Sequence, residues 1–263
     1  MTRNRANTEN YRPMLSVRLP AASVAKSVVH SLAASVLVTL AAVSLPAQAE
    51  TNAQLGLVTE YVRDGISETR GNFAAQGGIN YVHNSGVYGG VWASQLQRKD
   101  DDSHSEWDFY SGISRSLTSE LGVDAGFTRY TFQGDSSRDE DNLNHYNEVH
   151  ARVSYDQSLV LGWRHTNHYI GSRFARRVVE ASYTLHSSDF DFEFYGAQHR
   201  LLGLDDDYNY GHDDRDSYWH FRVGVERTYN QWDYRLTLER TNLTSDFDAG
   251  TTFQFGIHRY FDF

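Results

Sequence analysis

The chain ends, at residues 251–263, in the stretch TTFQFGIHRYFDF. Every second residue from Thr251 to Ile257 is a threonine or a large apolar residue, and the residues between them are polar or glycine. An alternation with a period of two places the apolar side chains on one face of an extended strand and the polar ones on the other. The end of the chain is therefore predicted to be a β-strand between an apolar and a polar environment.

The same alternation recurs along the chain after residue 49, where no stretch shows a helical repeat. It is clear at 147–155, 177–185, 190–195, 219–226 and 232–239, and weaker at 53–62, 74–83, 87–96, 106–115, 120–130 and 159–168. With the last segment this makes twelve strands, an even number, each near the roughly 9–11 residues that a tilted membrane-spanning strand needs.

The connections between these strands alternate in length. Short ones are predicted at 84–86, 116–119, 156–158, 186–189 and 228–231, and long ones at 63–73, 97–105, 131–146, 169–175, 198–217 and 242–250. This alternation is typical of outer-membrane barrels, which have short periplasmic turns and long extracellular loops. The predicted fold is all-β, a single transmembrane antiparallel up-and-down barrel of about twelve strands. A soluble periplasmic barrel or sandwich explains each strand singly, but not the alternating connections.

The composition excludes several other classes of protein. The chain has no cysteine, which excludes a disulfide scaffold, a thiolate metal site and a cysteine nucleophile. All three prolines and both methionines lie within the first 49 residues, so the remaining chain seldom interrupts its backbone ladders. A mean hydropathy of −0.59 argues against a bundle of membrane helices. The net charge of −10 argues against nucleic acid as a partner.

Residues 1–49 are predicted to be a cleaved secretory signal peptide. A soft apolar run occupies 28–43, basic residues precede it, and Ala47-Gln48-Ala49 forms a small-x-small cleavage site before Glu50. The alternative is a membrane anchor helix, for which the apolar run is short. Met1 and Met14 both remain possible starts. Removal of five basic residues and one acidic residue with this leader gives residues 50–263 a net charge of −14.

The aromatic residues at the end of the chain form a candidate assembly signal. The alternating residues here are Phe253, Phe255, Ile257, Phe261 and Phe263, with Arg259 as the one interruption. This end is similar to the terminal-strand signal of proteobacterial outer-membrane proteins, which implies the barrel-assembly machinery as a partner. The alternative is the aromatic last strand of any β protein.

A set of fixed spacings marks residues 59–96, which read TEYVRDGISETRGNFAAQGGINYVHNSGVYGGVWASQL. The spaced residues are Gly65, Ser67, Gln76, Gly77, Gly78, Tyr81, His83, Ser85, Gly86, Tyr88, Gly90, Trp92 and Ser94. This stretch resembles the uncharacterised bacterial outer-membrane family Gcw_chp, which implies location and architecture but no activity. The sequence departs from the family pattern at Asp64, where the family has Arg, and at Gln95, where it has Asn.

The glycine pairs of this motif have a physical interpretation. Gly77-Gly78 and Gly89-Gly90 fall on strands that are joined by the tight turn at 84–86. Glycine within a strand marks a bend or a close approach of another group. We expect these glycines to help the sheet close and to leave room for Tyr88 and Trp92, rather than to bind a ligand.

Parity along the strands predicts a charged inner face. The residues assigned to the lumen are Asp108, Asp124, Glu148, His150, Arg152, Arg164, Glu180, Glu193, His220, Arg222, Glu226, Arg235, Glu239 and His258, with Glu60, Asp191 and Asp233. Two interpretations are open. The charges line a narrow pore that weakly favours cations or zwitterionic small solutes, or they pair into a network that plugs the lumen.

No enzyme, metal or cofactor is expected. His104, His165 and His168 lie near the outer strand ends, but none has a spacing that demands catalysis. The acidic run at 205–214 contains oxygen ligands suited to Ca²⁺, yet it lacks a calcium-loop spacing and is expected to be a solvated loop facing lipopolysaccharide. The predicted function is a passive channel for small hydrophilic solutes in the outer-membrane lipid. The alternative is a closed barrel with a structural or surface-interaction role.

Overall fold

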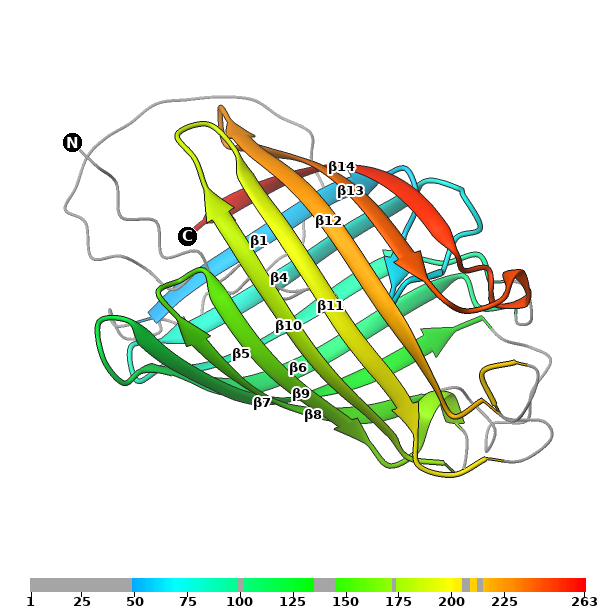
Figure 1. Ribbon diagram of the computed structural model, residues 1–263. Helices are drawn as coiled ribbons and strands as arrows, with labels where there is room; N and C mark the ends of the chain where they lie inside the picture. Colours follow the sequence, from blue (N-terminus) through cyan, green and yellow to red (C-terminus); the bar gives the residue numbers. More distant parts are fainter. Residues whose placement is uncertain (1–48, 99–101, 135–144, 172–173, 205–208, 212–214) are drawn as a thin grey trace.

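The computed structural model describes residues 49–98, 102–134, 145–171, 174–204, 209–211 and 215–263 (Figure 1). The predicted signal peptide lies outside the described residues except for Ala49. Most of the acidic run at 205–214 also lies outside them. Among the described residues, no helix is both long and apolar enough to cross a membrane.

Twelve antiparallel strands form a closed barrel, in which each strand pairs with its neighbours along the chain and the first pairs with the last. They are β1 (Ala49–Val58), β4 (Ala74–His83), β5 (Val87–Gln95), β6 (Ser105–Ser116), β7 (Leu121–Gln133), β8 (Tyr146–Tyr155), β9 (Leu159–Thr166), β10 (Arg176–His186), β11 (Asp191–Leu201), β12 (Ser217–Tyr229), β13 (Trp232–Thr241) and β14 (Thr251–Asp262). The all-β, twelve-stranded antiparallel barrel predicted from the sequence is confirmed.

The barrel closes where β1 pairs with both β14 and β4. Ala53 lies opposite Phe261 on β14 and opposite Ile79 on β4. β1 ends at Val58, earlier than the predicted 53–62, because the chain turns into the lumen after Thr59, which still bonds to Phe255 on β14. β11 is longer than the predicted 190–195, since its ladder with β10 continues as far as Leu201.

The two ends of the barrel differ (Figure 1). Short turns join β4 to β5, β6 to β7, β8 to β9, β10 to β11 and β12 to β13 at one end, where the chain also terminates. The longer connections gather at the other end and include two single turns of 3-10 helix, η2 (Tyr169–Gly171) and η3 (Ser245–Phe247). We call these the short-turn end and the long-loop end.

The outer face of the barrel is apolar. Side chains such as Phe221 and Val223 on β12 and Leu161 on β9 are about half exposed, whereas their neighbours in sequence point inward and are more buried. Trp107, Trp163 and Trp219 are exposed toward the long-loop end, and Tyr183, Tyr229 and Trp232 are exposed toward the short-turn end. An apolar band between two aromatic girdles is the surface of a barrel that contacts lipid, which a soluble sandwich does not have.

A charge in the middle of this apolar band should destabilise the barrel. Val223 lies at the centre of β12 and is 46% exposed. We expect Val223→Arg to lower the free energy of unfolding in lipid vesicles by about 2–4 kcal/mol, because the guanidinium cannot be hydrated there. Urea titration followed by tryptophan fluorescence measures the change.

Val223→Ala is the matched control, which removes the same side chain without adding charge. It should cost about 1–1.5 kcal/mol, the value of the lost apolar area. Equal losses in the two variants would show that the outer face of β12 does not lie in the hydrocarbon region.

Candidate functional site

The first long connection does not stay at the rim of the barrel but folds into it. Residues 62–67 form a small antiparallel pair of strands, β2 (Val62–Arg63) and β3 (Ile66–Ser67), and we call residues 60–69 the lumen hairpin. Most of its side chains are buried, including those of Tyr61 and Thr69. The long connection predicted at 63–73 therefore enters the barrel from the long-loop end. Its side chains pair with the inner face of the wall.

The tip of the hairpin is an Asp-Gly turn. Asp64 and Gly65 both have positive φ, 54° and 78°, which is the backbone of a two-residue type I′ hairpin turn. A side chain at position 65 would collide with Thr241 and His220, so glycine is also required by the close approach of the wall. Asp-Gly between Arg63 and Ile66 is a recognised hairpin signal. It was available in the sequence, although the prediction did not use it.

Asp64 is held by two arginines of the wall. Its Oδ1 accepts from Arg164 on β9 at 2.7 Å, and its Oδ2 accepts from Arg176 on β10 at 2.8 Å. The hydroxyl of Tyr218 on β12 donates to the backbone oxygen of Asp64 at 2.9 Å. The side chains of all three ionic partners are at most 3% exposed. Asp64 thus joins the hairpin tip to three strands, two through its carboxylate and one through its backbone oxygen.

The same two arginines also bind Glu148 on β8. Arg164 donates to its Oε1 at 3.2 Å, and Arg176 donates to its Oε2 at 3.0 Å. Two guanidinium groups therefore face two carboxylates, Asp64 and Glu148, in a closed ring of charge-assisted bonds. Such a ring satisfies the buried charges, which would be strongly unfavourable alone.

A second anchor lies on β6, which is separated from β9 by β7 and β8. Glu106 accepts from Arg63 at 2.6 Å and from the hydroxyl of Tyr61 at 3.0 Å, and it is fully buried. Arg63 also pairs with Glu68 of the hairpin at 2.7 Å, and Glu68 in turn pairs with Arg98 at 2.5 Å. The hairpin is thereby held by ion pairs at two separate places on the wall.

Backbone contacts complete the attachment. The amide of Ser67 donates to the oxygen of Asp248 at 2.9 Å, and Ile66 forms an antiparallel bridge with Ala249. The side chain of Gln254 on β14 donates to the backbone oxygen of Glu60. The hairpin therefore fills the lumen at the long-loop end.

The electrostatics of the hairpin follow from these contacts. Burial raises the pKa of the Asp64 carboxyl, but Arg164 and Arg176, with the His199 ring, outweigh burial and hold that pKa well below its ordinary value of 3.8. Burial also raises the pKa of Glu68, while Arg63 and Arg98 outweigh it and lower that pKa. Both carboxylates are ionised at neutral pH.

The lumen toward the short-turn end is polar and less tightly covered. Glu193 on β11 accepts from Arg222 at 2.6 Å and also pairs with Arg235 on β13. On the opposite wall, Asp124 lies 2.7 Å from the ring of His150 and 3.8 Å from Arg152. The side chains of Asp124, Arg152 and Arg235 are 22%, 18% and 18% exposed, so water reaches this half of the lumen more readily than the hairpin half.

All residues assigned to the lumen by parity lie on the inner face of the wall, apart from Glu60 in the hairpin. Those near the hairpin are Asp108, Glu148, Arg164, His220 and Glu239, and those farther toward the short-turn end are Asp124, His150, Arg152, Glu180, Asp191, Glu193, Arg222, Glu226, Asp233, Arg235 and His258. Sequence reasoning missed Glu106 and Arg176. Glu106 lies two residues before Asp108 on β6, and Arg176 lies two residues before Val178 on β10, so both point inward. The residues assigned to the lumen did not extend to these strand ends.

The family-motif residues divide between three places. Gly65 and Ser67 lie in the hairpin, Ser85 and Gly86 lie in the β4–β5 turn, and Gln76, Gly78, Tyr88, Gly90, Trp92 and Ser94 follow the inner alternation, with Gly77, Tyr81 and His83 on the outer one. Inside, Trp92 lies over Gly78 and the ring of Tyr110 over Gly90, where a Cβ would collide with it. In the turn, His83 Nδ1 lies 2.8 Å from Ser85 Oγ. These positions give the motif a packing role.

The predicted terminal signal residues are all in or next to β14. Phe253, Phe255, Ile257 and Phe261 follow its outer alternation, and Phe263 comes directly after the strand and is 81% exposed. Of the histidines near the outer rim, His165 has local side-chain partners. His165 stacks on Trp163 and lies 2.9 Å from the Asn167 amide oxygen. Within the described residues, no group of three or more His, Cys, Asp or Glu side chains is arranged to hold a metal.

Comparison with known proteins gives a family and a fold. A family model described as a bacterial protein of unknown function, Gcw_chp, matches residues 45–258. A solved structure described as the NanC porin is 11% identical and superposes with a TM-score of 0.52, over 79% of this chain and 97% of that chain. At this identity the likeness concerns the porin-like fold alone.

Other porin structures give lower scores. The KdgM porin is 10% identical with a TM-score of 0.48, over 81% of this chain and 99% of that one. OprD of Pseudomonas aeruginosa is 12% identical with a TM-score of 0.41, over 81% of this chain and 66% of that one. A comparison with curated proteins finds no match.

Loss of the Asp64 charge should free the hairpin. The chain has no cysteine, so a single Ser67→Cys reports exposure of the buried hairpin to a maleimide. We expect Asp64→Asn to speed this labelling by about tenfold or more, because breaking a buried ion pair costs about 3–5 kcal/mol. Mass spectrometry of the folded protein measures the rate.

Asp248→Asn is the control. Asp248 pairs with Arg70 at 3.8 Å, but the two side chains are 29% and 48% exposed, and such surface pairs contribute about 0–1 kcal/mol. Labelling at the wild-type rate in Asp64→Asn would contradict the anchoring role of Asp64.

The hairpin should also stay locked in mild acid. The pKa of Asp64 is depressed in the folded state. The ionised carboxylate therefore stabilises the hairpin fully at a pH above the ordinary pKa of an aspartate, and this stabilisation is lost as the pH falls through the depressed pKa. We expect labelling of Ser67→Cys, measured relative to an exposed Ser188→Cys, to be the same at pH 7 and pH 5 and to rise only below about pH 4. Release already at pH 5–6 would show that another group controls the hairpin.

Proposed function

The chain belongs to the Gcw_chp family of bacterial proteins of unknown function, and from this premise we propose that it is a narrow channel for small hydrophilic solutes in the bacterial outer membrane, with the lumen hairpin as its gate. Residues 1–49 serve as the export signal, and the aromatic β14 recruits the barrel-assembly machinery. The short-turn end faces the periplasm, and the long-loop end faces lipopolysaccharide. No cofactor and no enzymatic activity belong to this proposal.

The observation that carries the proposal is that the hairpin lies buried inside the barrel without belonging to the wall. β1 pairs directly with β4 and β14, so the barrel ladder closes without β2 and β3. The hairpin is held mainly by side chains, above all by Asp64 and Arg63. It can therefore leave as a unit while the twelve-stranded wall stays intact, and its departure exposes a lumen lined by charged side chains.

The charges of the wall favour one class of solute. Nine of the acids assigned to the lumen and four arginines lie on the wall, since Glu60 lies in the hairpin. Arg176 adds a fifth arginine and Glu106 adds a tenth acid. With the hairpin withdrawn, an acidic wall interrupted by arginines attracts cations and zwitterions more than anions. Acidic solutes fit this pore poorly.

The second candidate is a closed barrel with a structural or surface-interaction role through its outer loops. The buried ring formed by Asp64, Glu148, Arg164 and Arg176 favours it, because such a network can hold the lumen shut permanently. The two candidates differ in whether removal of the hairpin opens a path for ions.

Planar-bilayer recording of refolded protein separates the two. In one variant, residues 62–67 are replaced by two glycines. In another, Ile66→Cys with Ala249→Cys joins the bridged pair by a disulfide. We expect a stepwise current that is larger in the excised variant than in the wild type, absent in the oxidised double-cysteine variant and restored by reductant. The reversal potential of the excised variant in a KCl gradient should indicate cation preference.

Heat-modifiable migration on SDS gels establishes that each variant has folded before recording. An excised and folded barrel that carries no resolvable current at any voltage overturns the channel proposal and supports the closed barrel. Equal currents before and after reduction of the disulfide overturn the gating role of the hairpin and leave the channel in place.

A further inference from the structure

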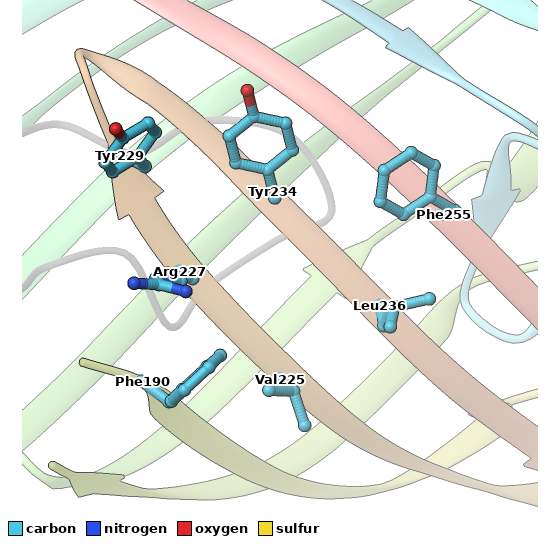
Figure 2. Close-up of a pocket in the computed structure, with 7 residues that line it drawn as sticks. All are labelled: Phe190, Val225, Arg227, Tyr229, Tyr234, Leu236 and Phe255. Carbon is cyan, nitrogen blue, oxygen red and sulfur yellow. The ribbon is translucent and has the colours of Figure 1, made fainter.

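A groove of about 540 Å³ lies on the outer face of the barrel, at the short-turn end of β12, β13 and β14 (Figure 2). It is lined by Phe190, Val225, Arg227, Tyr229, Tyr234, Leu236 and Phe255. These residues follow the outward alternation of their strands, so the groove does not communicate with the lumen.

The register of the strands explains its shape. Val225 lies opposite Leu236, and Leu236 lies opposite Phe255, which gives an apolar floor across three strands. Phe190, Tyr229 and Tyr234 stand nearer the short-turn rim and are larger than Val225 (Figure 2). A small side chain between larger ones leaves an elongated apolar depression that begins at the aromatic girdle.

One charge stands in this groove. The guanidinium of Arg227 lies 5.2 Å from the ring centre of Phe190 and 6.0 Å from that of Tyr229. Within the described part of the chain it has no carboxylate partner. Arg259 shows a different arrangement at the same end, since it donates to the Gln231 side chain at 2.9 Å and stacks on Trp232. Arg227 is thus a cation with unused donors, fixed by aromatic rings at the head of an apolar groove.

We propose that this groove binds one phospholipid molecule of the membrane leaflet at the short-turn end. Its phosphate accepts hydrogen bonds from Arg227, because the planar guanidinium matches the geometry of phosphate oxygens. The attraction between the two charges is stronger at the membrane interface than in water. One acyl chain lies along Val225, Leu236 and Phe255. The proposal rests on the membrane location in the proposed function, but not on conduction through the lumen.

Native mass spectrometry of the refolded barrel in a non-ionic ether detergent tests it. The probes are a dioleoyl phosphatidylglycerol and the dioleoylglycerol with the same chains but no phosphate. We expect one phosphatidylglycerol to bind per barrel, with dioleoylglycerol at least about fivefold weaker. Arg227→Gln should weaken phosphatidylglycerol binding by a similar factor and leave dioleoylglycerol unchanged.

Arg259→Gln is the matched control, since it removes an outward arginine from the same end but outside the groove. It should bind phosphatidylglycerol as the wild type does. Val225→Trp fills the floor and should weaken both lipids while keeping Arg227. Equal losses in the two arginine variants, or equal binding of the two probes, overturn the proposal. Heat-modifiable migration on SDS gels shows whether each variant is folded. The lipid-binding measurement does not depend on whether the barrel conducts current.

Discussion

Asp64 forms its ion pairs with Arg164 and Arg176 in a part of the barrel where neither partner meets water. On the wall, Glu148 binds both guanidinium groups and Glu180 also binds Arg164, so Asp64 supplies a further carboxylate that Arg164 and Arg176 share. Breaking a buried ion pair is unfavourable, so this pairing holds the hairpin in its place inside the wall. The packing of the lumen at the long-loop end depends on this pairing.

In the rest of the barrel, the strands fill a polar interior while their apolar side chains point outward. Inward tyrosines such as Tyr88 and Tyr110 are accommodated because Gly112 and Gly90 face them with no side chain of their own. The wall therefore alternates bulky and empty positions across neighbouring strands. This arrangement packs rings against backbone near β5 and β6 and leaves the charged pairs of Glu193 and Asp124 in the more accessible part of the lumen.

Strict alternation made the wall predictable, since a period of two fixes both the strands and the faces of their residues. The hairpin was not predictable in that way, because strands of two residues such as β2 and β3 are too short to show a period. Its turn residues were nevertheless visible at positions 64 and 65. Asp64 stood out only as a departure from the family pattern, and its partners come from distant strands that no local pattern connects. Arg176 was missed because the predicted strand began one residue after it.

The hairpin follows β1 directly in the chain, yet its partners come much later. Arg164, Arg176 and Tyr218 lie 100, 112 and 154 residues beyond Asp64, and Gln254 lies 194 residues beyond Glu60. Contacts of such long range cannot form until the intervening strands are in place, because the loop-closure entropy must be overcome first. The order of assembly follows from this. The ion pairs of Asp64 form only after β9 and β10 have joined the wall, and the bonds from Tyr218 and Gln254 follow with β12 and β14.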